Sequence, residues 1–193
     1  MQSSMSKWRA GLAGLTALIV SSTAGATMVL PIELEQMTVE SEVIMHARVL
    51  GQEVRWSKDH ARILTLTTIE VLAPIKNAVK GDRITIYQVA GTLDGVTFRI
   101  PGALQFEPGR EMVFFAMQFR DMLVSYGMGL GKYAVRTIGG KRWAMPEHGD
   151  VVFVKRDPRG HLVNAPRPDT TGQELSAFLD RLRAILAVTG GGQ

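Results

Sequence analysis

The sequence predicts a mainly β fold, a small OB-like β-barrel or sandwich with a short N-terminal helix and a C-terminal amphipathic helix. The chain contains many short runs rich in β-branched and other apolar residues, and turns that contain glycine or proline separate these runs. One run near the end places its apolar residues at helical spacing. Neither a repeat nor a linker divides the chain, so we expect the strands and the terminal helix to share one core.

The first 26 residues have the three-part pattern of a secretory signal peptide. Lys7 and Arg9 precede an apolar run over residues 12–20, and the small residues Ala24-Gly25-Ala26 end the segment. A membrane span needs roughly 20 apolar residues, so this run is too short to be one. The pattern predicts export, with cleavage leaving Thr27 at the N-terminus. A β-barrel domain is then expected over 27–165, followed by a Pro-containing lead, a helix and a Gly-rich tail over 166–193.

Composition narrows the class of protein. Hydrophobic residues make up 46% of the chain and charged residues 21%, as in globular rather than disordered proteins. The chain has no cysteine, which excludes a disulfide framework and a cysteine-linked lipid anchor. Eukaryotic secreted domains of this size usually carry disulfides, so we expect a bacterial protein that is periplasmic or extracellular.

Net charge argues against nucleic-acid binding. The chain has 22 basic and 18 acidic residues, and removal of Lys7 and Arg9 with the signal peptide leaves 20 against 18, a net charge of about +2. The remaining basic residues are scattered along the chain rather than gathered in a stripe. We therefore expect no nucleic-acid partner. No later stretch is long and apolar enough to predict a transmembrane segment.

The N-terminal half predicts one short helix, over residues 33–42, and three strands. Gly51 marks a bulge or bend in the first strand. In the second, the apolar alternation slips by one position after Leu66, which indicates a bulge or a coiled strand, and Pro74 is expected to end it. The three expected strands are Val43–Trp56, 62–72 and Arg83–Val89.

The C-terminal half predicts a long connection over 90–110, further short strands and a final helix. Thr171 and Glu174 have the spacing of a capping box at the start of that helix. The strands expected here are 111–118, 122–126, 133–138, 142–145, 151–154 and 161–163, the last four as two hairpins. The apolar face of the helix comprises Leu175, Phe178, Leu179, Leu182, Ile185 and Leu186.

Short motifs are spread over residues 34–136: 42–49, Arg55-Trp56, 65–72, Lys80-Gly81-Asp82, Pro101-Gly102, 106–109, 113–115 and 129–133. Together they resemble a group of uncharacterised exported bacterial proteins. The fold that this resemblance implies is similar to the OB-like barrel of netrin-type modules and tissue inhibitors of metalloproteases. Those inhibitors chelate the zinc of their target through an N-terminal cysteine, which this chain lacks. The resemblance implies a fold and export, and it transfers no catalytic residue.

The segment 91–109 is the best candidate for a specific binding surface, because long ordered loops on rigid scaffolds often carry binding sites. Arg99, Pro101, Gln105 and Phe106 offer a cation, a rigid turn, an amide and an aromatic anchor. The alternative is that the Phe106 ring plugs one end of the barrel. The residues of the segment are compatible with both interpretations.

Catalytic and metal sites have less support in the sequence. No Gly-x-Ser-x-Gly elbow is present, and Gly127, Gly129 and Gly131 lack the parallel βαβ setting of a phosphate loop. Four histidines lie far apart without the spacing of metal ligands, so we expect neither a metal nor a cofactor. They are His46, His60, His148 and His161.

These observations predict a non-enzymatic exported binding module that recognises a protein or an envelope component. The alternative from a different class is a small secreted hydrolase or metal-dependent enzyme that draws on the four histidines. A further alternative is a protease inhibitor, which rests on analogy of fold alone.

Overall fold

A computed structural model describes residues 27–190, and the protein is mainly β, as predicted. The predicted signal peptide, residues 1–26, and the last part of the predicted tail, residues 191–193, lie outside the described residues. The helices are α1 (Leu34–Glu40) and α2 (Leu175–Gly190). The strands are β1 (Thr27–Val29), β2 (Val43–Trp56), β3 (Ile63–Lys76), β4 (Arg83–Val89), β5 (Gly91–Leu93), β6 (Val96–Phe98), β7 (Glu111–Phe119), β8 (Met122–Ser125), β9 (Lys132–Ile138), β10 (Lys141–Pro146), β11 (Val151–Arg156), β12 (Leu162–Asn164) and β13 (Gln173–Glu174).

Eight strands form one mixed sheet in the order β13-β10-β9-β7-β2-β3-β4-β8, and β8 also pairs with β7. The pairings therefore run in a ring through β7, β2, β3, β4 and β8. The ring is weakest between β4 and β8, which run parallel and share a single residue pair, Ile86 with Leu123. This weak closure distinguishes the ring from a clean barrel.

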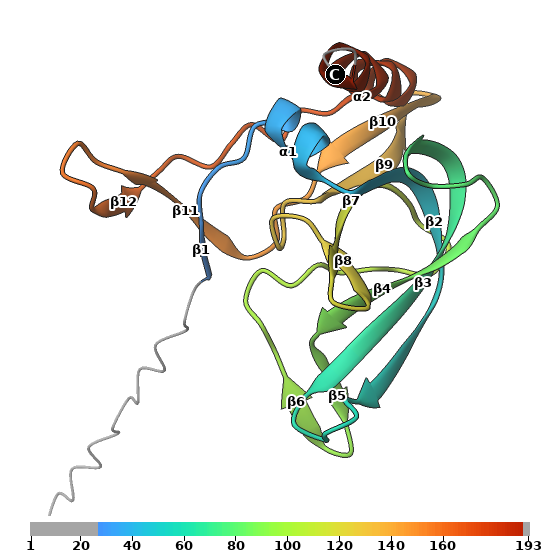
Figure 1. Ribbon diagram of the computed structural model, residues 1–193, viewed down its shortest axis with the longest axis vertical. Helices are drawn as coiled ribbons and strands as arrows, with labels where there is room; N and C mark the ends of the chain where they lie inside the picture. The colour runs from blue at the N-terminus through green and yellow to red at the C-terminus, as the bar shows by residue number, and fades with distance from the viewer. Residues whose placement is uncertain (1–26, 191–193) are drawn as a thin grey trace, which may run out of the picture.

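The remaining strands form two small sheets, β1-β11-β12 and β5-β6. Figure 1 shows both helices at one end of the molecule, the β5–β6 hairpin at the other, and β12 on a hairpin that projects to one side. Within residues 27–190, no helix is both long enough and apolar enough to cross a membrane.

Strands β2 and β3 are long because bulges let them curve around the ring. The predicted bulge at Gly51 is confirmed. Val49 lies opposite Ile69 and Gly51 opposite Thr68, so Leu50 is the extra residue. The phase slip after Leu66 in the sequence of β3 does not correspond to a bulge in that strand, because β3 pairs with β4 without a register shift from Leu64 to Glu70. The polar residue Thr67 is buried on the same face as Ile69, and this interrupts the apolar alternation in the sequence.

Two local predictions were wrong. Pro74 does not end β3, which continues to Lys76: Pro74 lies opposite Met45 beside a register shift, where a residue without an N–H is tolerated. The expected capping box is not formed either. Thr171 binds the carboxylate of Asp169 instead, and α2 begins only at Leu175 because Gln173–Glu174 pair with β10 as a strand.

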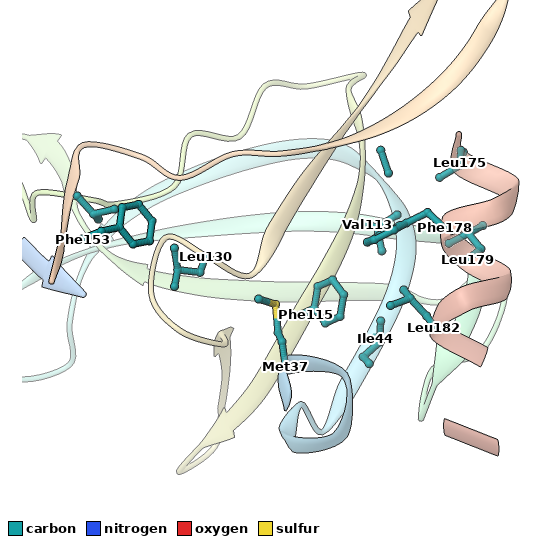
Figure 2. Packing of buried hydrophobic residues seen from close by; sticks show 12 residues of the cluster. Met37, Ile44, Val113, Phe115, Leu130, Phe153, Leu175, Phe178, Leu179 and Leu182 are labelled. Carbon is teal, nitrogen blue, oxygen red and sulfur yellow. The ribbon is translucent and has the colours of Figure 1, made fainter. Parts of the chain in front are cut away.

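The core has two parts, one on each side of the sheet. Inside the ring, alternate residues of β2, β3, β4 and β7 pack together with Leu104 and Phe106 from the long connection. On the outer face, α1, α2 and β11 cover β2, β7, β9 and β10. In Figure 2, Phe178 and Leu182 of α2 point at Val113 and Ile44 of the sheet, and Met37 of α1 lies beside Phe115. Leu175, Phe178, Leu179 and Leu182 of the predicted helix face are buried, whereas Ile185 and Leu186 are half-buried.

Candidate binding groove

Most of the segment 91–109 lies along a groove of about 640 Å³ at the side of the ring. We call it the loop groove. Its lining comes mainly from residues 88–105, with contributions from β2, β3 and the connection between β10 and β11. The polar side chains in the lining include Gln52, Gln88, Thr92, Arg99, Gln105 and Asp150.

The structure brings three of the four predicted binding residues together in this groove. Arg99 and Gln105 are exposed and Pro101 is half-buried, and all three line the groove. Phe106 does not. Its ring is 6% exposed and lies edge-on to Phe114 inside the ring of strands, with centroids 5.8 Å apart. This position corresponds to the plug alternative rather than to an exposed aromatic anchor.

Hydrogen bonds hold the loop that carries these residues. Gln88 Nε2 donates to the carbonyl of Leu104 over 3.1 Å, and Thr27 Oγ1 donates to the carbonyl of Pro101 over 2.5 Å. Lys132 Nζ donates to the carbonyl of Gln105 and lies 5.3 Å from the centroid of the Phe106 ring. The loop is therefore fixed from β1, β4 and β9, and its exposed side chains project from a rigid base.

A junction of three glycines also fixes the loop. Gly102 has φ +82°, and a Cβ there would come within 2.5 Å of Val151. The backbone of Gly102 is approached just as closely, because a Cβ on Gly129 or Gly149 would lie 2.6 or 3.1 Å from its carbonyl oxygen. Only glycine permits this convergence of three segments. Of the repeated glycines at 127–131, Gly129 and Gly131 lie against neighbouring backbone, and Gly127 has a positive φ of +60°, as in a turn.

Among the residues that the structure describes, Arg99 is the one cation that lines the loop groove. It forms no ion pair with any residue in the described range 27–190. The cations of a neighbouring cavity, in contrast, are paired. A second cavity of about 530 Å³ beside β9 contains Lys132 and Arg136, but Glu147 binds both, at 2.7 and 3.2 Å. The guanidinium of Arg99 therefore remains available to a ligand.

The four histidines lie in four separate environments. His60 stacks on Trp56 in the β2–β3 turn, and His161 pairs with Asp157 in the β11–β12 turn. His148 packs edge-on against Phe153, and His46 lies on β2. Among residues 27–190 no group of three or more histidine and carboxylate side chains could hold a metal ion. The four histidines therefore have different neighbours and do not form one cluster.

His46 instead belongs to a charged cluster that joins three strands. His46 Nε2 lies 3.0 Å from Glu111 Oε2, and Arg48 Nη2 donates to Glu111 Oε1 over 3.0 Å. Arg142 of β10 also binds Glu111 and lies 3.2 Å from His46 Nε2. Sequence analysis missed this cluster because its members come from β2, β7 and β10, and no local pattern marks their pairing.

Burial has opposite consequences for the two titratable groups at the centre of the cluster. It lowers the pKa of His46 below the ordinary 6.5, and the charges of Arg142 and Arg48 act in the same direction against the opposing effect of Glu111. Burial raises the pKa of Glu111, but hydrogen bonds from Arg48 and His46 and the charge of Arg142 bring it below the ordinary 4.5. A neutral imidazole beside an ionised carboxylate is therefore the stable pair at pH 7.

We expect the protein to lose stability as the pH falls through 6.5, because the unfolded chain then binds a proton on His46 that the folded chain does not. His148, whose pKa burial and the charge of Arg167 also lower, adds to the effect. His46→Gln keeps a hydrogen-bonding side chain and removes the titration. Urea unfolding midpoints measured from pH 8 to pH 5 are expected to fall less steeply in this variant than in the wild type. Parallel pH profiles would contradict the assignment.

The chain was compared with known proteins in three ways, and neither the protein-family models nor the curated proteins nor the solved structures gave a match.

Proposed function

We propose that this chain is an exported, non-enzymatic binding module that recognises a protein or an envelope component through the loop groove. The observation that carries the proposal is the convergence of Arg99, Pro101 and Gln105 in one groove on a loop fixed by three strands. A preorganised surface loses little conformational entropy on binding, so its contacts contribute fully to affinity.

The chemistry of the groove favours a polar partner with hydrogen-bonding groups. Amide and hydroxyl side chains predominate in its polar lining, and the described residues add one cation, Arg99, and one carboxylate, Asp150. Phe98, which also lines the groove, is 39% exposed and adds an aromatic face. A single arginine is a small electrostatic footprint compared with the basic stripe that binds nucleic acid. A peptide segment or a glycan of the envelope fits this surface better.

The proposal includes export and an OB-like fold. Residues 1–26 support export through their signal-peptide pattern, and removal of that segment would take away no element of the described fold, since β1 begins at Thr27. The ring β7-β2-β3-β4-β8 supports the OB-like assignment, because that fold is a five-stranded and partly open barrel. In this interpretation β9, β10 and β13 extend one side of the barrel.

The test is affinity capture from envelope and culture-medium extracts with the purified protein, followed by mass spectrometry of the retained species. Arg99→Glu is expected to weaken retention of the partner about tenfold, because it reverses the free charge in the groove. Gln105→Ala should weaken it in the same direction.

The matched control is Arg83→Glu. Arg83 is exposed on β4 and does not line the groove, so the same charge reversal there should leave retention unchanged. Equal loss of retention in both variants would indicate a nonspecific effect of net charge and would overturn the assignment of the groove. The assignment would also be overturned if Arg99→Glu did not alter retention of the partner.

A further inference from the structure

The weak closure of the ring leaves a further cavity, which differs in chemistry from the loop groove. Beyond the single pair Ile86–Leu123, β4 and β8 are not paired with each other. A cavity of about 260 Å³ lies at this seam, between β4, β8 and residues 100–104, and we call it the seam pocket. Figure 1 shows β8 beside β4 at this side of the ring. The seam pocket and the loop groove thus adjoin the same short loop.

The seam pocket is apolar and its mouth is exposed. Side chains from inside and outside the ring contribute to the lining, among them Leu64, Ile86, Val89, Ile100, Leu104 and Val124. Phe119 and Met128 also line it, although 51% and 50% of their surfaces remain exposed. Single exposed apolar residues are ordinary on soluble proteins, but two beside an apolar cavity are typical of a ligand site.

One cation lies in this apolar lining. Within the described part of the chain, Arg62 is the only charged residue that lines the seam pocket, and its side chain is exposed. It forms no ion pair with any residue of the described chain, although its charge contributes to lowering the pKa of Asp59 in the same turn. An apolar cavity with a free guanidinium at its rim is complementary to an amphiphile that has an anionic head.

We propose that the seam pocket binds a medium-chain fatty carboxylate, with the alkyl chain among the apolar side chains and the carboxylate paired with Arg62. The cavity of about 260 Å³ limits the chain to medium length, because a longer one would extend past Phe119 and Met128 into water. The proposal does not rest on the loop groove, since Arg62 does not line that groove and Arg99 does not line this pocket.

The experiment titrates the purified protein with decanoate, octanoate and decanol, by calorimetry and by NMR of methionine methyl groups. Decanoate should shift the signals of Met122 and Met128, which line the pocket, and leave that of Met28 on β1 unmoved. Octanoate should bind roughly fifteenfold more weakly, because each buried methylene contributes about fourfold in affinity.

Two variants separate the parts of the proposal. Arg62→Gln should weaken decanoate roughly fivefold and leave decanol unchanged, because it removes an exposed ion pair. Ala103→Leu fills the lining and should abolish binding of all three probes. The control for it is Ala184→Leu, the same change at an exposed position of α2 beside another apolar surface.

Some outcomes would overturn the proposal. If decanoate does not shift the methyl signals of Met122 and Met128, it does not bind in the seam pocket. If Arg62→Gln changes the affinity for decanoate no more than the affinity for decanol, the carboxylate is not paired with Arg62. If Ala184→Leu lost binding to the same extent as Ala103→Leu, the binding would be nonspecific adsorption. Because Arg62→Gln alters only an exposed side chain, the test remains informative even if Ala103→Leu fails to fold.

Discussion

Phe106→Ala is expected to lower the free energy of unfolding by about 3–5 kcal/mol. The Phe106 ring is almost fully buried inside the ring of strands, edge-on to Phe114, and Lys132 lies over its face. Truncation would leave a cavity at the end of a core that cannot collapse around it, because the loop above is fixed at Leu104 and Gln105. Urea unfolding, followed by circular dichroism, measures the loss.

The control for this change is Phe98→Ala, which removes the same ring from an exposed position on β6. Its expected effect on stability is within about 0.5 kcal/mol. Under conditions in which Phe106→Ala remains folded, we expect its affinity for the partner to be close to that of the wild type. If Phe106→Ala instead had unchanged stability but no longer bound the partner, Phe106 would be the aromatic anchor of the binding site.

Phe178→Ala is expected to cost a similar amount, about 3–5 kcal/mol, and to release α2 from the sheet. Phe178 is 1% exposed, and its ring lies 4.7 Å from that of Tyr133 on β9. It is the largest of the four buried side chains on α2, and in Figure 2 it points directly at the sheet. Loss of the aromatic side chain of Phe178 removes the main contact between α2 and the outer face of the sheet.

Hydrogen exchange measures this release most directly. Amides of α2 should exchange much faster in Phe178→Ala, whereas amides of β3 inside the ring should change less, because they belong to the other part of the core. Val188→Ala on the same helix is the control. Val188 is 82% exposed, and its truncation should alter neither stability nor exchange. Uniform acceleration across both parts would show that they unfold as one unit.

Local patterns in the sequence predicted the elements better than their assembly. The helical spacing of Leu175, Phe178, Leu179 and Leu182 identified the buried face of α2 because a helix repeats within a few residues. The bulge at Gly51 could be predicted because a glycine inside a strand pattern marks such an irregularity locally. Pro74 and the apparent capping box at Thr171 misled because strands distant in the sequence decide both. Pro74 lies opposite Met45 on β2 beside a register shift, and Glu174 of the expected box pairs with Trp143 on β10.

The candidate sites show the same limit. Arg99, Pro101 and Gln105 share one loop, so their neighbourhood could be inferred from the sequence, but the burial of Phe106 depends on Phe114 across the ring. The pairing of His46 with Glu111 and Arg142, and the cavity beside Ile86 and Leu123, arise only when distant strands meet. Nothing in the local sequence encodes such a meeting.

The pairing of the first strand with β11 determines when the chain can fold. Thr27 lies opposite Val151, and Glu35 of α1 binds Arg181 of α2, so the first elements complete their contacts only with the last quarter of the chain. Closing such long loops costs entropy before any contact repays it, which slows folding. An N-terminal fragment leaves the outer core incomplete, and we expect the native state to form only after synthesis has reached α2.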